Sequence, residues 1–221
     1  MVRLFSAKGF KLFNLRVAPV RELVLATVLL AVGGCQRNPL LVTRSLCPAV
    51  AVPNFTGDTT LFRGDGTAAS DIDLVATMTN VRGACVDGDD RIGTNVSFDV
   101  LARRVATAGA RTISLPFFAT VVQGGNLLVS KQVGAVTLSF ADGAARTQAT
   151  VRAHADVDRA AMKMSEAINK KVNRVRKAGD LDAATDPFAD PEVKAAVRAV
   201  TFEVLVGFQL SDDALAYNAS K

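Results

Sequence analysis

Three cysteines and a single histidine carry the side chains in this sequence that most often do chemistry in proteins. His154 lies in an alternating segment, on the same face as Arg152 and Asp156 and opposite its apolar neighbours. We therefore expect this histidine to be solvated rather than catalytic. The sequence contains no G-x-S-x-G turn that would supply a serine nucleophile to it. With one imidazole available, a site built from several histidines is excluded.

The other reactive side chains also lack the partners that chemistry would need. Cys47 and Cys85 form no C-x-x-C pair and have no histidine cluster around them, so neither catalytic thiol chemistry nor a zinc site is expected. In an oxidising compartment they favour one disulfide, and two buried, unpaired thiols are the alternative. Asp87, Asp89 and Asp90 lack the closing glutamate of an EF-hand calcium loop. We expect no catalytic residue, no metal and no cofactor, and we interpret the protein as a non-enzyme.

The N-terminal segment has the three parts of a secretion signal. Basic residues come first, residues 23–32 are apolar throughout, and Gly33 and Gly34 follow. A helix of the apolar length spans about 15 Å, half of the roughly 30 Å hydrocarbon core of a bilayer. This segment is therefore too short to cross a membrane, and residues 1–34 are predicted to be a signal peptide.

The residues Val32-Gly33-Gly34-Cys35 resemble the lipobox of bacterial lipoproteins. The resemblance implies a diacylglycerol on Cys35, cleavage before it and acylation of the new amino group. Several acyl chains would anchor the protein firmly to a membrane. Gln36 stands where an aspartate would favour inner-membrane retention, which implies the periplasmic face of the outer membrane. Residues 35–46 are then expected to be a lipidated tether.

The positive charge of the chain belongs mainly to the leader. The formal net charge is +5. Residues 1–34 carry five basic side chains against one acid, which leaves the remainder near neutrality. Nucleic-acid binding needs a basic patch on the folded domain, so no nucleic-acid partner is expected.

Residues 47–221 read as one mainly β domain, an antiparallel, immunoglobulin-like β-sandwich. Alternating apolar runs separated by glycine and aspartate turns indicate many short strands. In residues 94–106, Val96, Phe98 and Val100 alternate with Ser97 and Asp99, and Gly124-Gly125-Asn126 indicates a hairpin. The strands are expected at residues 49–53, 59–62, 72–82, 94–106, 114–122, 127–140, 146–157 and 200–210.

A helical insertion, at about residues 158–198, is expected before the last strand, and a short helix at residues 212–218 after it. Apolar residues at spacings of three and four predict a helix over residues 159–177, stopped by Gly179. Asp190-Pro191 predicts a capped second helix through Arg198. We expect the apolar stripe of the first helix to dock on the sandwich.

The insertion also holds the most charged surface of the domain. Residues 158–177 carry a net charge of +5, and residues 178–192 carry −5. One interpretation is a solvated basic face whose charges neutralise each other locally, and the other is a surface for anionic lipid or an acidic partner. The possible interaction surface consists of Lys163, Lys170, Lys171, Arg174, Arg176 and Lys177.

Further segments resemble uncharacterised lipoproteins of proteobacteria. These are Cys47-Pro48, Leu115-Pro116-Phe117-Phe118, the apolar run at residues 202–210, and Leu215-Ala216-Tyr217-Asn218. That family implies location and fold but no activity.

We expect a lipid-anchored, non-catalytic binding or scaffold module that binds another envelope protein. A carrier or sensor of an apolar small molecule is the alternative, and it predicts an apolar cavity of roughly 300 Å³ or more within the sandwich. An enzyme would need convergent carboxylates with shifted pKa values in a cleft.

Overall fold

The computed structural model describes residues 45–64, 66–177 and 179–221. The predicted signal peptide, the lipid site at Cys35 and the tether up to residue 44 lie outside the described residues. No helix in these three ranges is long and apolar enough to cross a membrane.

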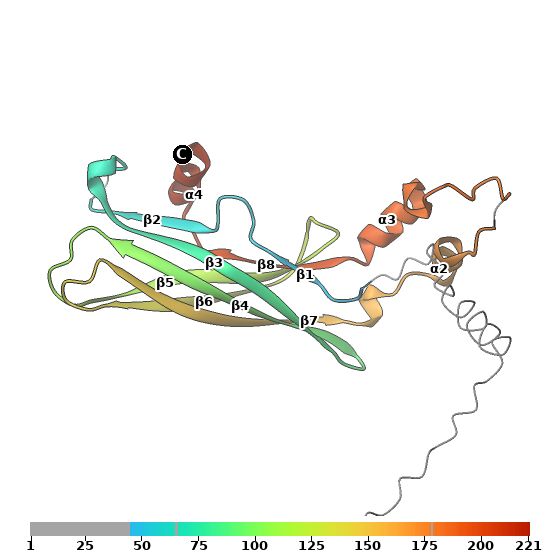
Figure 1. The fold of residues 1–221 in the computed structure, drawn as a ribbon, viewed down its shortest axis with the longest axis horizontal. Helices are drawn as coiled ribbons and strands as arrows, with labels where there is room; N and C mark the ends of the chain where they lie inside the picture. The colour runs from blue at the N-terminus through green and yellow to red at the C-terminus, as the bar shows by residue number, and fades with distance from the viewer. Residues whose placement is uncertain (1–44, 65, 178) are drawn as a thin grey trace, which may run out of the picture. The chain divides into compact units, whose positions relative to one another are not determined.

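Two four-stranded sheets form the domain, as predicted for a mainly β sandwich (Figure 1). The first sheet has the order β1 (Ala49–Ala51), β8 (Phe202–Phe208), β5 (Arg111–Gln123) and β6 (Leu127–Phe140). The second has the order β2 (Asp58–Phe62), β3 (Ile72–Asp87), β4 (Arg91–Arg104) and β7 (Arg146–Asp158). β1 pairs parallel with β8, and the other pairs are antiparallel. A short 3-10 turn, η2 (Ala69–Asp71), precedes β3.

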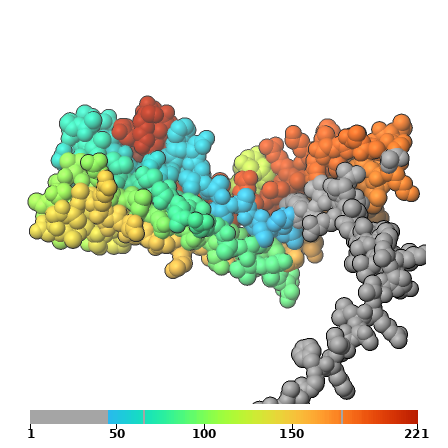
Figure 2. Space-filling view, viewed as in Figure 1, coloured from blue at the N-terminus to red at the C-terminus, as the bar shows by residue number. Residues whose placement is uncertain are grey.

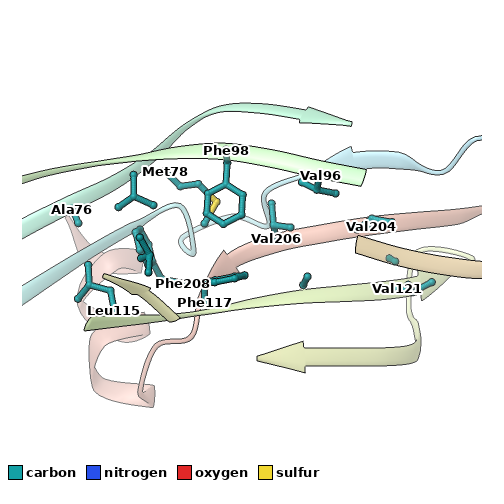
Figure 3. Packing of buried hydrophobic residues seen from close by; sticks show 14 of the residues in the cluster. Ala76, Met78, Val96, Phe98, Leu115, Phe117, Val121, Val204, Val206 and Phe208 are labelled. Atoms are coloured by element: carbon teal, nitrogen blue, oxygen red, sulfur yellow. The ribbon is translucent and has the colours of Figure 1, made fainter. Parts of the chain in front are cut away.

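The core lies between the sheets and follows the alternation of the sequence. On β4, Val96, Phe98 and Val100 are buried, while Ser97 and Asp99 are partly exposed on the outer face. Phe98 meets Phe117 of the opposite sheet edge to face, with ring centroids 5.4 Å apart (Figure 3). This contact joins the two sheets at the centre of the apolar cluster.

A disulfide between Cys47 and Cys85 links the segment before β1 to β3. The two Cα atoms are 5.7 Å apart, within the usual range for a disulfide. The prediction of one disulfide is confirmed, and the alternative of two free thiols is wrong.

Arg104, at the end of β4, is buried without a carboxylate partner among the described residues. Its guanidinium donates hydrogen bonds to the carbonyl oxygens of Ala144, Thr107 and Ala141 at 2.7–2.9 Å. The group also lies over the ring of Phe140, 5.1 Å from its centroid. Arg104 therefore holds the β4–β5 and β6–β7 loops together at one end of the sandwich.

The helical insertion differs from the predicted long helix. Residues 159–177 contain a 3-10 turn, η3 (Ala160–Met162), and one short helix, α2 (Glu166–Asn173). Met162 is buried in the sandwich core directly after β7, so the chain turns there before a helix can begin. Ser165 then caps α2 by accepting the N–H of Ile168. The helix ends before Gly179.

The apolar stripe of α2 packs on the next helix, and the expectation that it docks on the sandwich is wrong. Ile168 and Val172 form a second apolar cluster with Val193 of α3 (Pro191–Ala199). Phe188, from the short turn η4 (Pro187–Ala189), packs against the same cluster. The insertion thus has a small core of its own.

The C-terminal helix α4 (Asp212–Ser220) is present as expected and is capped by Ser211. Its Asn218 is buried and donates two hydrogen bonds of 2.8 Å, to the carbonyl oxygens of Phe55 and Asp58. These bonds hold α4 beside β2, as Figure 1 shows.

Candidate interaction surface

Three of the six basic residues singled out in the sequence, Lys171, Arg174 and Arg176, are paired with the acidic segment that follows them. Lys171 lies 2.6 Å from a carboxylate oxygen of Asp190 and 2.8 Å from one of Glu192, and Arg174 pairs with Asp182. The hydrogen bond from Arg174 lowers the pKa of the Asp182 carboxyl, and the one from Lys171 lowers the pKa of Asp190. The expected local neutralisation is therefore built into the fold of the insertion.

Two of the four remaining members of that set also form ion pairs. Arg176 has a largely buried side chain with Nε 3.4 Å from Asp182, and Lys170 pairs with Glu166 one turn before it on α2. Lys163 precedes the helix, and the backbone N–H of Lys177 donates to Asp180. Four of the six basic side chains, those of Lys170, Lys171, Arg174 and Arg176, are thus held in ion pairs within the insertion, while Lys163 and Lys177 are exposed.

His154 lies on the outer face of the second sheet, as predicted, with half of its side chain exposed. Its Nδ1 is 2.7 Å from the amide oxygen of Asn95, and its Nε2 is 3.0 Å from a carboxylate oxygen of Asp156. These hydrogen-bond partners include no nucleophile. Within the described ranges, no group of three or more His, Cys, Asp or Glu residues could hold a metal ion.

The most unusual surface is the edge formed by residues 127–135, called the β6 edge below. Among the described strands β6 pairs only with β5, so its other side is unpaired. Leu127, Leu128, Val129 and Val133 are each exposed by 52–61%. Edge strands are normally protected by charges, proline or cover, yet this one has Lys131 as its one charged side chain. The β6 edge is therefore a ready surface for another chain.

The register shows which main-chain groups face outward. The carbonyl oxygen of Pro116 accepts the N–H of Gln209 at 2.9 Å, so Pro116 directs its main-chain groups towards the β8 side. Pro116 is paired with Ala135. Because facing residues of an antiparallel pair alternate between bonded and non-bonded positions, Ala135, Val133 and Lys131 direct their N–H and C=O groups away from β5. These groups are free for a further strand.

An open groove of about 920 Å³ adjoins the start of the β6 edge, between the β5–β6 turn and α3. Leu127 lines it on one side, and Lys194 and Arg198 of α3 line it on the other. Neither cation has an ion pair in the described part of the chain. Glu203 is the one acid among the lining residues, so the groove carries more positive than negative charge.

One side-chain and one main-chain hydrogen bond connect the two sides of the groove. The Gln123 amide donates to the carbonyl oxygen of Ala199 at 2.5 Å, and the N–H of Gly124 donates to that of Thr201 at 2.9 Å. Gly124 and Gly125 both have positive φ, and a Cβ on Gly124 would lie 3.3 Å from the carbonyl oxygen of Arg198, so glycine at position 124 lets the turn approach α3 closely. Figure 2 shows this yellow-green turn beside the orange-red α3.

Sequence reasoning placed β6 correctly but did not identify its exposed edge. The signal lies in the loss of alternation: residues 127–129 are consecutively apolar, whereas residues 135–140 alternate strictly and bury Val136, Leu138 and Phe140. The carrier hypothesis called for an apolar cavity inside the sandwich. Two grooves of the described residues exceed that volume, at about 920 and 810 Å³, and both are open to solvent.

Comparison of the chain with family models, with curated proteins and with solved structures found no match.

Proposed function

We propose that this protein is a lipid-anchored, non-catalytic binding module of the cell envelope that holds another envelope protein at its β6 edge. The leader and the lipobox-like residues before Cys35 support the anchor. The exposed apolar edge of β6 is the observation that carries the binding role.

Strand addition at such an edge has a clear physical basis. An incoming strand satisfies the outward N–H and C=O groups and covers the exposed leucine and valine side chains. Fully burying a leucine or valine side chain stabilises by roughly 1.5–3 kcal/mol, and each of these four side chains has about half of that burial still to gain. The gross gain, about 3–6 kcal/mol plus hydrogen bonds, competes with the entropy cost of association.

Site-specific photocrosslinking in intact cells tests this proposal. A photoreactive amino acid replaces Val133 in the full chain, and a matched control carries it at Arg152, an exposed strand residue of the other sheet. Each is made with Cys35 and with Cys35→Ala. We expect one dominant protein adduct from position 133, absent from position 152 and lost without Cys35.

Equal adducts from both positions, or none from position 133, would contradict the binding role. Persistence of the adduct with Cys35→Ala would contradict the need for the anchor. Native mass spectrometry of the detergent extract gives an independent check, because a co-purifying small apolar molecule would favour a carrier.

A further inference from the structure

The β6 edge and the cationic groove are continuous, because Leu127 belongs to both. A strand that pairs with residues 131–135 and continues to Leu127 reaches the groove at the residue that lines one of its sides. At about 3.3 Å per residue, a segment of about nine residues is as long as the β6 edge, from residue 135 to residue 127. One extended ligand is therefore able to contact both features.

The charges of the groove determine which ligand groups would bind on its α3 side. Lys194 and Arg198 are four residues apart on α3, which places them on the same helix face. They face one acid, Glu203, and are not neutralised by the carboxylates that pair with Lys171 and Arg174. Carboxylate groups of an incoming chain would complement them.

The direction of the added strand relative to β6 decides which of its ends reaches Lys194 and Arg198. β6 runs from the groove at Leu127 towards Phe140. An antiparallel partner begins near Ala135 and ends at the groove, so its C-terminal side meets Lys194 and Arg198. Antiparallel pairing is also slightly the more stable arrangement for each residue.

We infer that the partner presents an extended segment that adds antiparallel to β6, with alternating apolar side chains and an acidic C-terminal end held by Lys194 and Arg198. This inference rests on the proposed function, and it names the chemistry of the partner segment. Lys131, whose Nζ lies 5.3 Å from the ring centroid of Phe118, adds a third positive charge along the same path.

A library of displayed random nonapeptides with free C-termini provides the probe. It is selected against the full chain purified from membranes in detergent. We expect enrichment of apolar residues at alternate positions and of Asp or Glu at the last positions. Lys194→Glu combined with Arg198→Glu should weaken the selected acidic peptides about tenfold or more and shift a new selection towards Lys and Arg.

Val133→Pro tests strand addition without disturbing the fold. The N–H of Val133 points away from β5, so proline there removes an outward donor and leaves the β5–β6 pairing intact. We expect at least a tenfold loss of peptide affinity with an unchanged unfolding midpoint. Val133→Thr keeps the N–H and should retain most of the binding.

The outcomes separate the two proposals. Peptides that bind Val133→Pro as tightly as the unaltered chain would overturn β6 docking and with it the proposed function. Two outcomes would overturn this inference alone. In one, the peptides need the N–H of Val133 but show no preference for acidic residues. In the other, they prefer acidic residues, but Lys194→Glu with Arg198→Glu leaves that preference unchanged. A selection that enriches nothing would also overturn it, while the crosslinking result would still decide the proposed function.

Discussion

Removing the disulfide should cost a large part of the stability of the domain. The pair Cys47–Cys85 closes a loop of 38 residues. The chain-entropy expression for a loop of that length gives about 3.9 kcal/mol at 25 °C through restriction of the unfolded chain. The folded state loses little in the substitution Cys47→Ala with Cys85→Ala, because neither the β3–β4 pairing nor the main apolar cluster depends on the sulfur atoms.

Urea unfolding of the full chain measures this effect, with Cys35→Ala as the control that leaves the pair intact. We expect the unfolding free energy to fall by about 4 kcal/mol, with an m-value that still reports complete unfolding. A loss below about 1 kcal/mol at constant m-value would refute the loop-entropy reasoning. A reduced m-value would show instead that β1, which has only three paired residues, detaches separately.

Three further substitutions test other parts of the fold. Arg104→Met removes three partly buried hydrogen bonds and leaves the carbonyl oxygen of Ala144 without a donor, while those of Thr107 and Ala141 keep backbone N–H donors. At about 1 kcal/mol for each bond it should cost about 3 kcal/mol in urea unfolding, and a stability equal to that of the unaltered chain would contradict this role. The hydrogen bonds from Arg111 lower the pKa of Asp73 below its ordinary value of 3.8, so this pair stabilises above that pH and loses its effect as pH falls. Asp73→Asn should therefore destabilise by no more than about 1 kcal/mol at pH 7 and flatten the acid side of the stability profile, whereas an unchanged acid slope would count against the pair. Gly134→Ala places a Cβ 2.6 Å from Cζ of Phe117 and should cost about 1–3 kcal/mol, and a neutral result would mean that the ring moves freely.

The sheets could be predicted because each buried strand repeats one simple pattern. In β4 the alternation of Val96, Phe98 and Val100 with polar residues fixes which face meets the core, and the structure buries the expected face. Cys47 and Cys85 could be paired because few alternatives existed once the leader cysteine was set aside. In both cases the residue types along the sequence were sufficient for the prediction.

The insertion could not be predicted in detail because periodicity does not say which core a residue joins. Met164, Ile168 and Val172 of the predicted stripe join the small cluster with Val193, yet the neighbouring Met162, which lies outside that stripe, is buried in the sandwich core. The helix therefore begins only after Met162, at the Ser165 cap. Tertiary packing therefore shortened the helix that the spacing of apolar residues predicts.

The β6 edge was missed for a related reason. A strand pattern predicts that residues 127–140 form a strand, but the neighbour on each side is decided by the whole topology. The chain leaves β6 for the other sheet through the loop held by Arg104, so no later strand returns to cover residues 127–135. The connection leaves this edge uncovered, and the consecutive apolar residues 127–129 are the sign of it in the sequence.

The insertion divides its cations into a paired set and an unpaired set, and this division can be tested. Lys171 joins α2 to the start of α3 through Asp190 and Glu192, and these hydrogen bonds raise the pKa of Lys171. Lys171→Gln should therefore speed amide hydrogen exchange across α2 and α3 while leaving the preference for acidic peptides unchanged.

Lys170→Gln is the matched control, since Lys170 pairs only with Glu166 on its own helix and should leave exchange in α3 unaltered. If Lys171→Gln instead abolished the acidic preference, the paired cations would belong to the binding surface, and the assignment of separate roles to Lys171 and to Lys194 with Arg198 would be wrong. Lys194 and Arg198 lie on α3, the helix that Lys171 anchors. Lys171→Gln could therefore speed hydrogen exchange in α3 and still leave the preference for acidic peptides unchanged. That result would show that the groove depends mainly on the contacts of Gln123 and Gly124 with Ala199 and Thr201.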